Sequence, residues 1–244
     1  MRIRMAQFAI YRDLTSNLRH ILGVLRTSQP GEMVVFPEGA LSGYAPKDPS
    51  YLDGLDATAI DDAIGRITTE ANTIGCRCLV GSATKDGDHW RNAVLMFDGD
   101  AEPKRYFKAE LSGLDRRHFE PGPAAGAVFA AGDATIGVVA CRELIFPGVW
   151  MQLKSRGAQV VFHLNNAIEP HDALWSHLLI ARAIEQGVFV CSVNNAAAPQ
   201  RLPSMLIAPS GRVILQTEVQ SDQVLAAEID LNDVIAELAT RGDY

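Results

Sequence analysis

The chain has 244 residues, of which 48% are hydrophobic and 21% charged, a balance that suits one globular α/β domain with a sizeable core. Its formal net charge of -7 is spread along the sequence and argues against nucleic acid as the main partner. No apolar run approaches the roughly 20 residues that span a bilayer, and the short, charged start does not read as a signal peptide. We therefore expect a cytoplasmic protein with no membrane partner.

The first part of the chain alternates between strand and helix patterns. Residues 3–8 predict a strand, and Asp13 can cap the helix that follows. Residues 33–36 predict a short buried strand. An apolar stripe over residues 60–74 then predicts a second helix, which Gly75 is placed to end.

The same alternation continues to the end of the chain. Further strands are predicted at residues 78–81, 93–97, 135–140, 158–164, 188–193, 205–208, 212–215 and 224–229. Pro147 can begin a helix that ends before Gly157, and residues 172–186 predict a longer helix with Leu174 on its apolar face. A last short helix is predicted over residues 231–238. The pattern indicates an α/β fold with helix-covered sheets, in one domain over residues 1–244.

The four cysteines suit a reducing compartment, because the separations of Cys76, Cys78, Cys141 and Cys191 suggest no disulfide framework. Cys76 and Cys78 have the form of half a metal site. No second pair of Cys or His with ligand spacing accompanies them, so we expect no metal.

Three reactive side chains directly follow apolar strand patterns, where catalytic groups of α/β folds tend to lie. Glu38 follows Phe36-Pro37, Lys108 ends the segment that begins at Arg105, and Cys141 follows the strand over residues 135–140. At a strand-to-helix turn, neighbouring N–H groups favour the nucleophilic thiolate form of a cysteine. Taken singly, each residue also has an inert interpretation: a solvated carboxylate, a solvated amine and a buried thiol.

The order and surroundings of these residues resemble the nitrilase, or carbon-nitrogen hydrolase, superfamily and its amidase-like branch. The resemblance extends over essentially the whole chain, because several further motifs follow in the family's order. The matching segments are residues 36–38, Lys108, 115–122, 141–147, 181–186 with Asn194, 204–211 and 228–231.

The resemblance implies a four-layer α-β-β-α sandwich that needs no cofactor. It implies that Glu38 is the general base, that Cys141 forms a thioester with the acyl group, and that Lys108 and the backbone N–H of Arg142 hold the oxyanion. Asp115 stands where the family usually has Glu, and it is expected to support Lys108. The residue after the nucleophile is often aromatic in the family and is Arg142 here.

The resemblance also implies a small amide or N-carbamoyl substrate and a homodimer or higher homo-oligomer. Tyr44 and Asn166 are candidate residues of the substrate pocket. Trp150 and Trp175 lie on or near the helices through which the family often pairs its subunits, so either aromatic could belong to an interface or to the core.

Three alternatives remain. A class I glutamine amidotransferase uses a His-x-Glu pair after its nucleophile, whereas His118-Phe119-Glu120 precedes Cys141 here. Residues 41–48 resemble the nitrilase-type glutaminases that supply ammonia to a synthetase, which would have to be a partner. A non-catalytic binding relative is the third alternative, and the presence of all three reactive residues argues against it.

Overall fold

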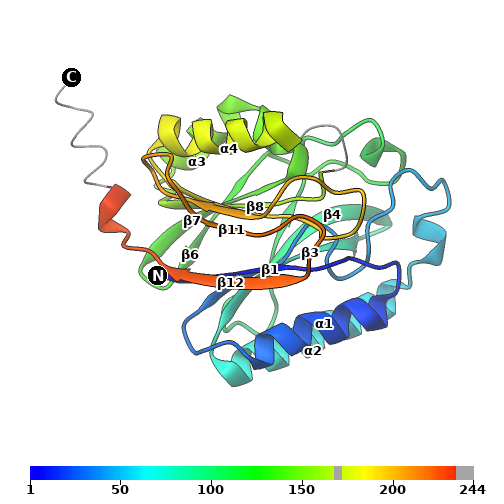
Figure 1. Ribbon diagram of the computed structural model, residues 1–244. Helices are drawn as coiled ribbons and strands as arrows, with labels where there is room; N and C mark the ends of the chain where they lie inside the picture. The colour runs from blue at the N-terminus through cyan, green and yellow to red at the C-terminus, as the bar shows by residue number, and fades with distance from the viewer. Residues whose placement is uncertain (168–171, 235–244) are drawn as a thin grey trace.

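The computed structural model describes residues 1–167 and 172–234 as two six-stranded sheets packed face to face between helices (Figure 1). Helices α1 (Leu14–Arg26) and α2 (Ala57–Ile74) cover one sheet, and helices α3 (Pro147–Ser155) and α4 (Asp172–Gln186) cover the other. This is the predicted four-layer α-β-β-α sandwich.

The first sheet has the strand order β12-β1-β2-β3-β4-β5. Its strands are β1 (Arg2–Gln7), β2 (Met33–Val35), β3 (Arg77–Asp86), β4 (His89–Phe97), β5 (Lys104–Phe107) and β12 (Gln223–Glu228). Strands β1, β2 and β3 are parallel, and the others pair antiparallel. The two covering helices begin at aspartate caps, and Asp13 accepts hydrogen bonds from the backbone of Thr15 and Ser16 as predicted.

The second sheet has the strand order β11-β10-β9-β8-β7-β6. Its strands are β6 (Ala127–Ala131), β7 (Ala134–Ala140), β8 (Val160–Leu164), β9 (Phe189–Val193), β10 (Met205–Ile207) and β11 (Val213–Gln216). Strands β7, β8 and β9 are parallel. Short 3-10 helices lie at η1 (Leu52–Gly54), η2 (Asp115–Arg117) and η3 (Cys141–Ile145).

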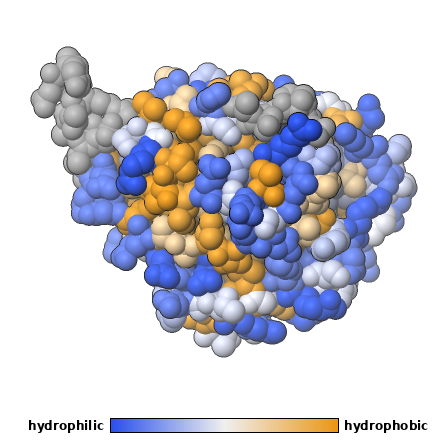
Figure 2. All heavy atoms as spheres, viewed as in Figure 1, coloured by the Kyte–Doolittle hydropathy of each residue, from blue (hydrophilic) through white to orange (hydrophobic). Residues whose placement is uncertain are grey.

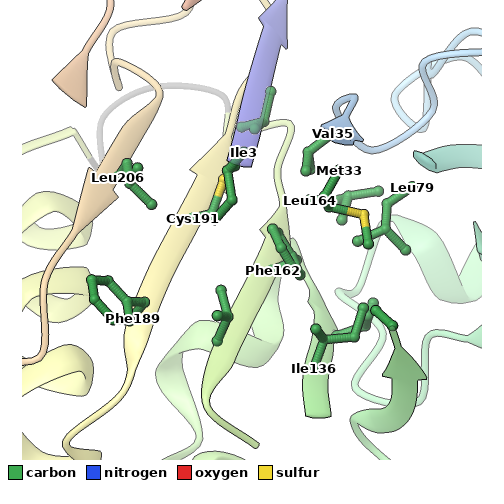
Figure 3. Packing of buried hydrophobic residues seen from close by; sticks show 14 of the residues in the cluster. Ile3, Met33, Val35, Leu79, Ile136, Phe162, Leu164, Phe189, Cys191 and Leu206 are labelled. Carbon is green, nitrogen blue, oxygen red and sulfur yellow. The ribbon is translucent and has the colours of Figure 1, made fainter. Parts of the chain in front are cut away.

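The main core lies between the two sheets, where buried side chains from facing strands pack together (Figure 3). Ile3, Met33 and Leu79 project from the first sheet against Ile136 and Phe162 of the second. Burying such side chains stabilises the fold by about 1.5–3 kcal/mol each relative to exposure. This packing therefore fixes the position of one sheet relative to the other, and with it the positions of the strand ends.

One edge of the sandwich carries β12 of the first sheet and β11 of the second, which lie side by side. Figure 2 shows hydrophobic residues gathered on the face of the molecule that carries these strands, and Val213 and Val224 are exposed there. No helix in the described ranges is long and apolar enough to cross a membrane.

Several expectations about individual elements were wrong. Strand β6 was not predicted, and β3 and β4 are longer than their apolar runs. The apolar face of α4 is rotated from the predicted one: Leu174 is 55% exposed, while Leu179 is buried. Residues 235–238 of the predicted last helix lie outside the described part of the chain.

Trp150 and Trp175, the two candidate interface residues, lie in the core of the single chain. Trp150 is fully buried and donates a hydrogen bond from Nε1 to the carbonyl of Glu143 at 3.2 Å. Trp175 is 7% exposed and packs in the same helix-facing core. The interface interpretation is therefore wrong for Trp150, whose indole has no surface to offer a second subunit.

Candidate active site

Strand ends from both sheets bring the candidate catalytic residues to one place. Glu38 follows β2, Lys108 follows β5, and Cys141 follows β7 across the sheet interface. Gly81 of β3 makes the Glu38 turn possible, because a Cβ at this position would lie 2.5 Å from the Pro37 carbonyl oxygen. A larger residue there would displace the candidate base.

Lys108 is the centre of a buried charged cluster. Its Nζ lies 2.8 Å from Oε1 of Glu38 and 2.9 Å from Oδ2 of Asp115. All three side chains are at most 1% exposed. Burial by itself would lower the pKa of Lys108, but the surrounding negative charge, that of Glu38 above all, raises it well above its usual value. Lys108 is therefore a fixed cation and not a proton carrier.

Glu38 has one oxygen fully engaged and one without a partner. Its Oε1 accepts hydrogen bonds from Lys108 and from Nδ2 of Asn92, the latter at 2.8 Å. Its Oε2 is buried with no hydrogen-bond partner among the described residues. Burial raises the pKa of Glu38, although Lys108 opposes the shift. The free oxygen is thus the more basic of the two and is available to take a proton.

Asp115 lies beneath Lys108 and is completely buried, so it is not a surface carboxylate paired with Arg116 or Arg117. Its two oxygens also accept hydrogen bonds from the hydroxyl of Tyr44 and from the backbone N–H of Ser112 at 3.1 Å. Burial would raise the pKa of Asp115, but the combined effect of Lys108 and these donors lowers it. The carboxylate remains charged and anchors the lysine.

Cys141 begins η3 with a positive φ of 41° and is partly exposed. Burial, and next the charge of Glu38, raises the pKa of its thiol, while Lys108 and the backbone N–H of Asn166 lower it. Only a short 3-10 turn directly follows the cysteine, so the stabilisation of a thiolate by helical N–H groups stays a prediction. The thiol keeps its proton until a base removes it.

His163 supports the peptide bond that follows Cys141, a role not visible in the sequence pattern. Its Nε2 lies 2.9 Å from the carbonyl oxygen of Cys141, and its Nδ1 lies 2.9 Å from Oγ of Ser192. A carbonyl oxygen only accepts, so Nε2 carries the proton and Nδ1 accepts from the Ser192 hydroxyl. Burial lowers the pKa of His163 to about 4, which keeps the imidazole neutral. The histidine thereby orients the peptide unit whose N–H belongs to Arg142.

Glu143 is a third buried carboxylate of this region. It joins the two sheets, and sequence reasoning did not single it out. One oxygen accepts hydrogen bonds from the hydroxyl of Tyr106 and, at 3.0 Å, from the backbone N–H of Ala109. The other accepts from the backbone N–H of Ala140 at 2.8 Å. These bonds tie the segment just after Lys108 to the residue just before Cys141.

A cavity of about 250 Å³ opens beside the sulfur of Cys141. Tyr44 and Asn166, the two predicted pocket residues, both line it. The side chain of Asn166 is already held by protein groups, because Oδ1 accepts from Gln200 at 2.8 Å and Nδ2 donates to the carbonyl of Glu38 at 3.2 Å. Within residues 1–167 and 172–234, no group of three or more His, Cys, Asp or Glu side chains could hold a metal ion.

Comparison with known proteins assigns the family. The sequence profile of the carbon-nitrogen hydrolase family matches residues 2–236. The chain belongs to this family. As a carbon-nitrogen hydrolase, it is an enzyme that acts on C–N bonds other than peptide bonds.

Several known proteins are similar to this carbon-nitrogen hydrolase. A nitrilase from Pyrococcus abyssi is 26% identical over 84% of the chain and 79% of its own length. A glutamine-dependent NAD(+) synthetase from Xylella fastidiosa is 30% identical over 93% of the chain, which spans only 44% of that protein. An amidase from Nesterenkonia sp. AN1 has the same fold, with a TM-score of 0.84, 22% identity and 99% of each chain covered.

Proposed function

We propose that this enzyme hydrolyses a small amide or N-carbamoyl compound through a thioester formed on Cys141. The observation that carries the proposal is the buried Lys108, which is bonded to both Glu38 and Asp115 and lies close enough to influence the charge of Cys141, a residue that lines the cavity. A lysine held between two carboxylates is a preorganised positive charge in a site of low dielectric constant. Such a charge is suited to an oxyanion that forms beside the sulfur.

In the first half of the reaction, Oε2 of Glu38 takes the proton of the Cys141 thiol as the sulfur attacks the amide carbon. The carbonyl oxygen becomes an oxyanion, which Nζ of Lys108 and the backbone N–H of Arg142 stabilise. When the tetrahedral intermediate collapses, the C–N bond breaks and Glu38 returns the proton to the leaving nitrogen. Ammonia or an amine departs, and the acyl group remains on sulfur as a thioester.

In the second half, Glu38 takes a proton from water, and the resulting hydroxyl oxygen attacks the thioester carbon. The same oxyanion donors hold the new intermediate. The C–S bond then breaks, the sulfur recovers a proton from Glu38, and the carboxylic acid leaves. The raised pKa of Glu38 suits both directions of proton transfer, because the group must accept and release a proton in each half of the cycle.

The Nesterenkonia amidase supports a cysteine nucleophile in this fold. In one of its structures, with a TM-score of 0.85, the acetamide moiety of fluoroacetamide is covalently added at the active site cysteine. The corresponding proposal for this chain is that an acyl group or another electrophile bonds to the sulfur of Cys141.

A nitrilase-type glutaminase is the second candidate. The 30% identity to glutamine-dependent NAD(+) synthetases favours it. Ammonia release from glutamine, measured with the purified chain alone and again with cell extract, separates the two candidates. A glutaminase that depends on a partner becomes active only in the second assay.

The test of the proposed function measures released ammonia over a panel of primary amides and N-carbamoyl compounds. The chain should release ammonia from at least one of them, and intact-mass spectrometry should detect its acyl group on the protein. Cys141→Ala should abolish both signals, whereas Cys191→Ala, at a cysteine buried in the sheet core, should retain them. Activity that survives in Cys141→Ala would refute the thioester mechanism.

A further inference from the structure

The cavity beside Cys141 has an unusual distribution of charge. Two cationic side chains, Lys47 and Arg142, are among the residues that line it, and among the described residues of its lining there is no Asp or Glu. This contrasts with the whole chain, in which 29 acidic residues outnumber 22 lysines and arginines. The entrance to the site is therefore locally positive in a protein of net negative charge.

Neither cation is neutralised within the described part of the chain. The ion pairs there are formed by other lysines and arginines. Asp48, the acid next to Lys47 in sequence, is already paired with Arg12. The guanidinium of Arg142 lies 5.5 Å from the centre of the Phe146 ring, a cation–π contact that helps to hold its position without cancelling its positive charge.

The remaining walls suit a short carbon chain. Pro46, Leu114, Ala167 and Trp175 contribute apolar surface around the 250 Å³ cavity. This volume is at the small end for a ligand site and excludes a bulky acyl group. A ligand that fills it lies beside Cys141 and within a lining that includes both cationic side chains.

We propose that the physiological substrate is an amide whose acyl group carries a carboxylate, such as the monoamide of a short dicarboxylic acid. This inference rests on the proposed function and specifies its substrate class. The catalytic cluster has more carboxylates than cations, so it repels an anionic substrate unless other charges compensate. Arg142 and Lys47 supply that compensation, and the planar guanidinium can bind a carboxylate through two parallel hydrogen bonds.

Arg142 thereby has two roles, one for its backbone and one for its side chain, that can be tested separately. Its backbone N–H is the candidate oxyanion donor, and its side chain binds the far end of the acyl group. Substituting the side chain by Gln retains the backbone donor and removes the charged guanidinium. This separation allows substrate selectivity to be tested apart from the chemistry.

The experiment compares kcat/KM for glutaramate with that for glutaramide, a neutral amide of nearly the same size. The enzyme should prefer glutaramate by about tenfold or more, the factor that corresponds to roughly 1.4 kcal/mol. In Arg142→Gln this preference should fall by about tenfold, mainly through KM, and in Lys47→Gln it should fall by less. Arg117→Gln, at an exposed arginine that does not line the cavity, should keep the wild-type preference. High salt should also reduce the preference in the wild type, because ions screen exposed charges.

Equal kcat/KM values for the two substrates would overturn this proposal and leave the proposed function standing. The same conclusion follows if Arg142→Gln lowers both values by the same factor. If neither compound is hydrolysed and no amide acylates Cys141, the proposed function fails, and the substrate class fails with it.

Discussion

The pH dependence of stability tests the role of the buried His163. The unfolded chain has an ordinary histidine pKa of 6.5, whereas burial lowers the value in the folded protein to about 4. Between these values the unfolded state binds the additional proton, so acid favours unfolding. The stability from the neutral imidazole is complete above pH 6.5 and is lost as the pH falls toward 4.

The size of the effect follows from the same two pKa values. One pKa unit corresponds to about 1.4 kcal/mol, so the full shift corresponds to about 3 kcal/mol. Most of this, about 2 to 3 kcal/mol, should be lost between pH 7 and pH 4.5. Carboxylates also contribute to the loss of stability in acid. A variant without the imidazole removes only the contribution of His163 to that loss.

The assay is urea unfolding of the wild type and His163→Gln at pH 7 and at pH 4.5. The unfolding free energy of the wild type should decrease by about 2 kcal/mol more than that of the variant. His89→Gln, at an exposed histidine, is the matched control and should follow the wild type. Equal losses in wild type and His163→Gln would show that this imidazole is not kept neutral by the fold, and the reasoning about its tautomer would fail with it.

Three further substitutions test other parts of the site. Glu38→Gln should slow thioester formation by about 10² to 10⁴, because an amide cannot take the thiol proton; a wild-type burst in single-turnover kinetics would remove Glu38 as the base. Asp115→Asn should lower kcat by about 10², since the lysine loses its anchoring charge, and near-normal kinetics would assign Asp115 a minor role. Glu143→Gln should lower the free energy of unfolding in urea by about 2–4 kcal/mol, because the new NH₂ group would face backbone donors. A loss below about 1 kcal/mol would contradict this account of Glu143.

Local sequence patterns determined most of the elements. The helix capped by Asp13 and the end of the second helix at Gly75 follow from nearby residues alone, and the structure contains both. Residues whose chemistry breaks an apolar strand are also visible locally. Glu38, Lys108 and Cys141 could therefore be noticed one by one, and the family resemblance joined them into a group. The structure brings all three to one place.

Elements whose burial depends on distant partners were not visible in this way. The buried face of α4 includes Arg182, which is 5% exposed and donates from Nε to the carbonyl of Leu144 at 3.3 Å. An apolar stripe cannot predict that an arginine faces the core, so the helix was assigned the wrong phase. Strand β6 is partly exposed at the edge of its sheet, and its sequence lacks the alternation that would have identified it.

Apart from Asp115, which the family resemblance already paired with Lys108, the partners of the catalytic residues follow only from the tertiary structure. Asn92 is 54 residues from Glu38, and Glu143 accepts a hydrogen bond from a residue 34 positions away. His163 reads as one more residue of a buried strand until the fold places its two nitrogens between Cys141 and Ser192. Sequence patterns report which groups can react and which segments can be buried. Hydrogen-bond partners, pKa shifts and the charge of a cavity arise only when segments remote in sequence exclude water from one another.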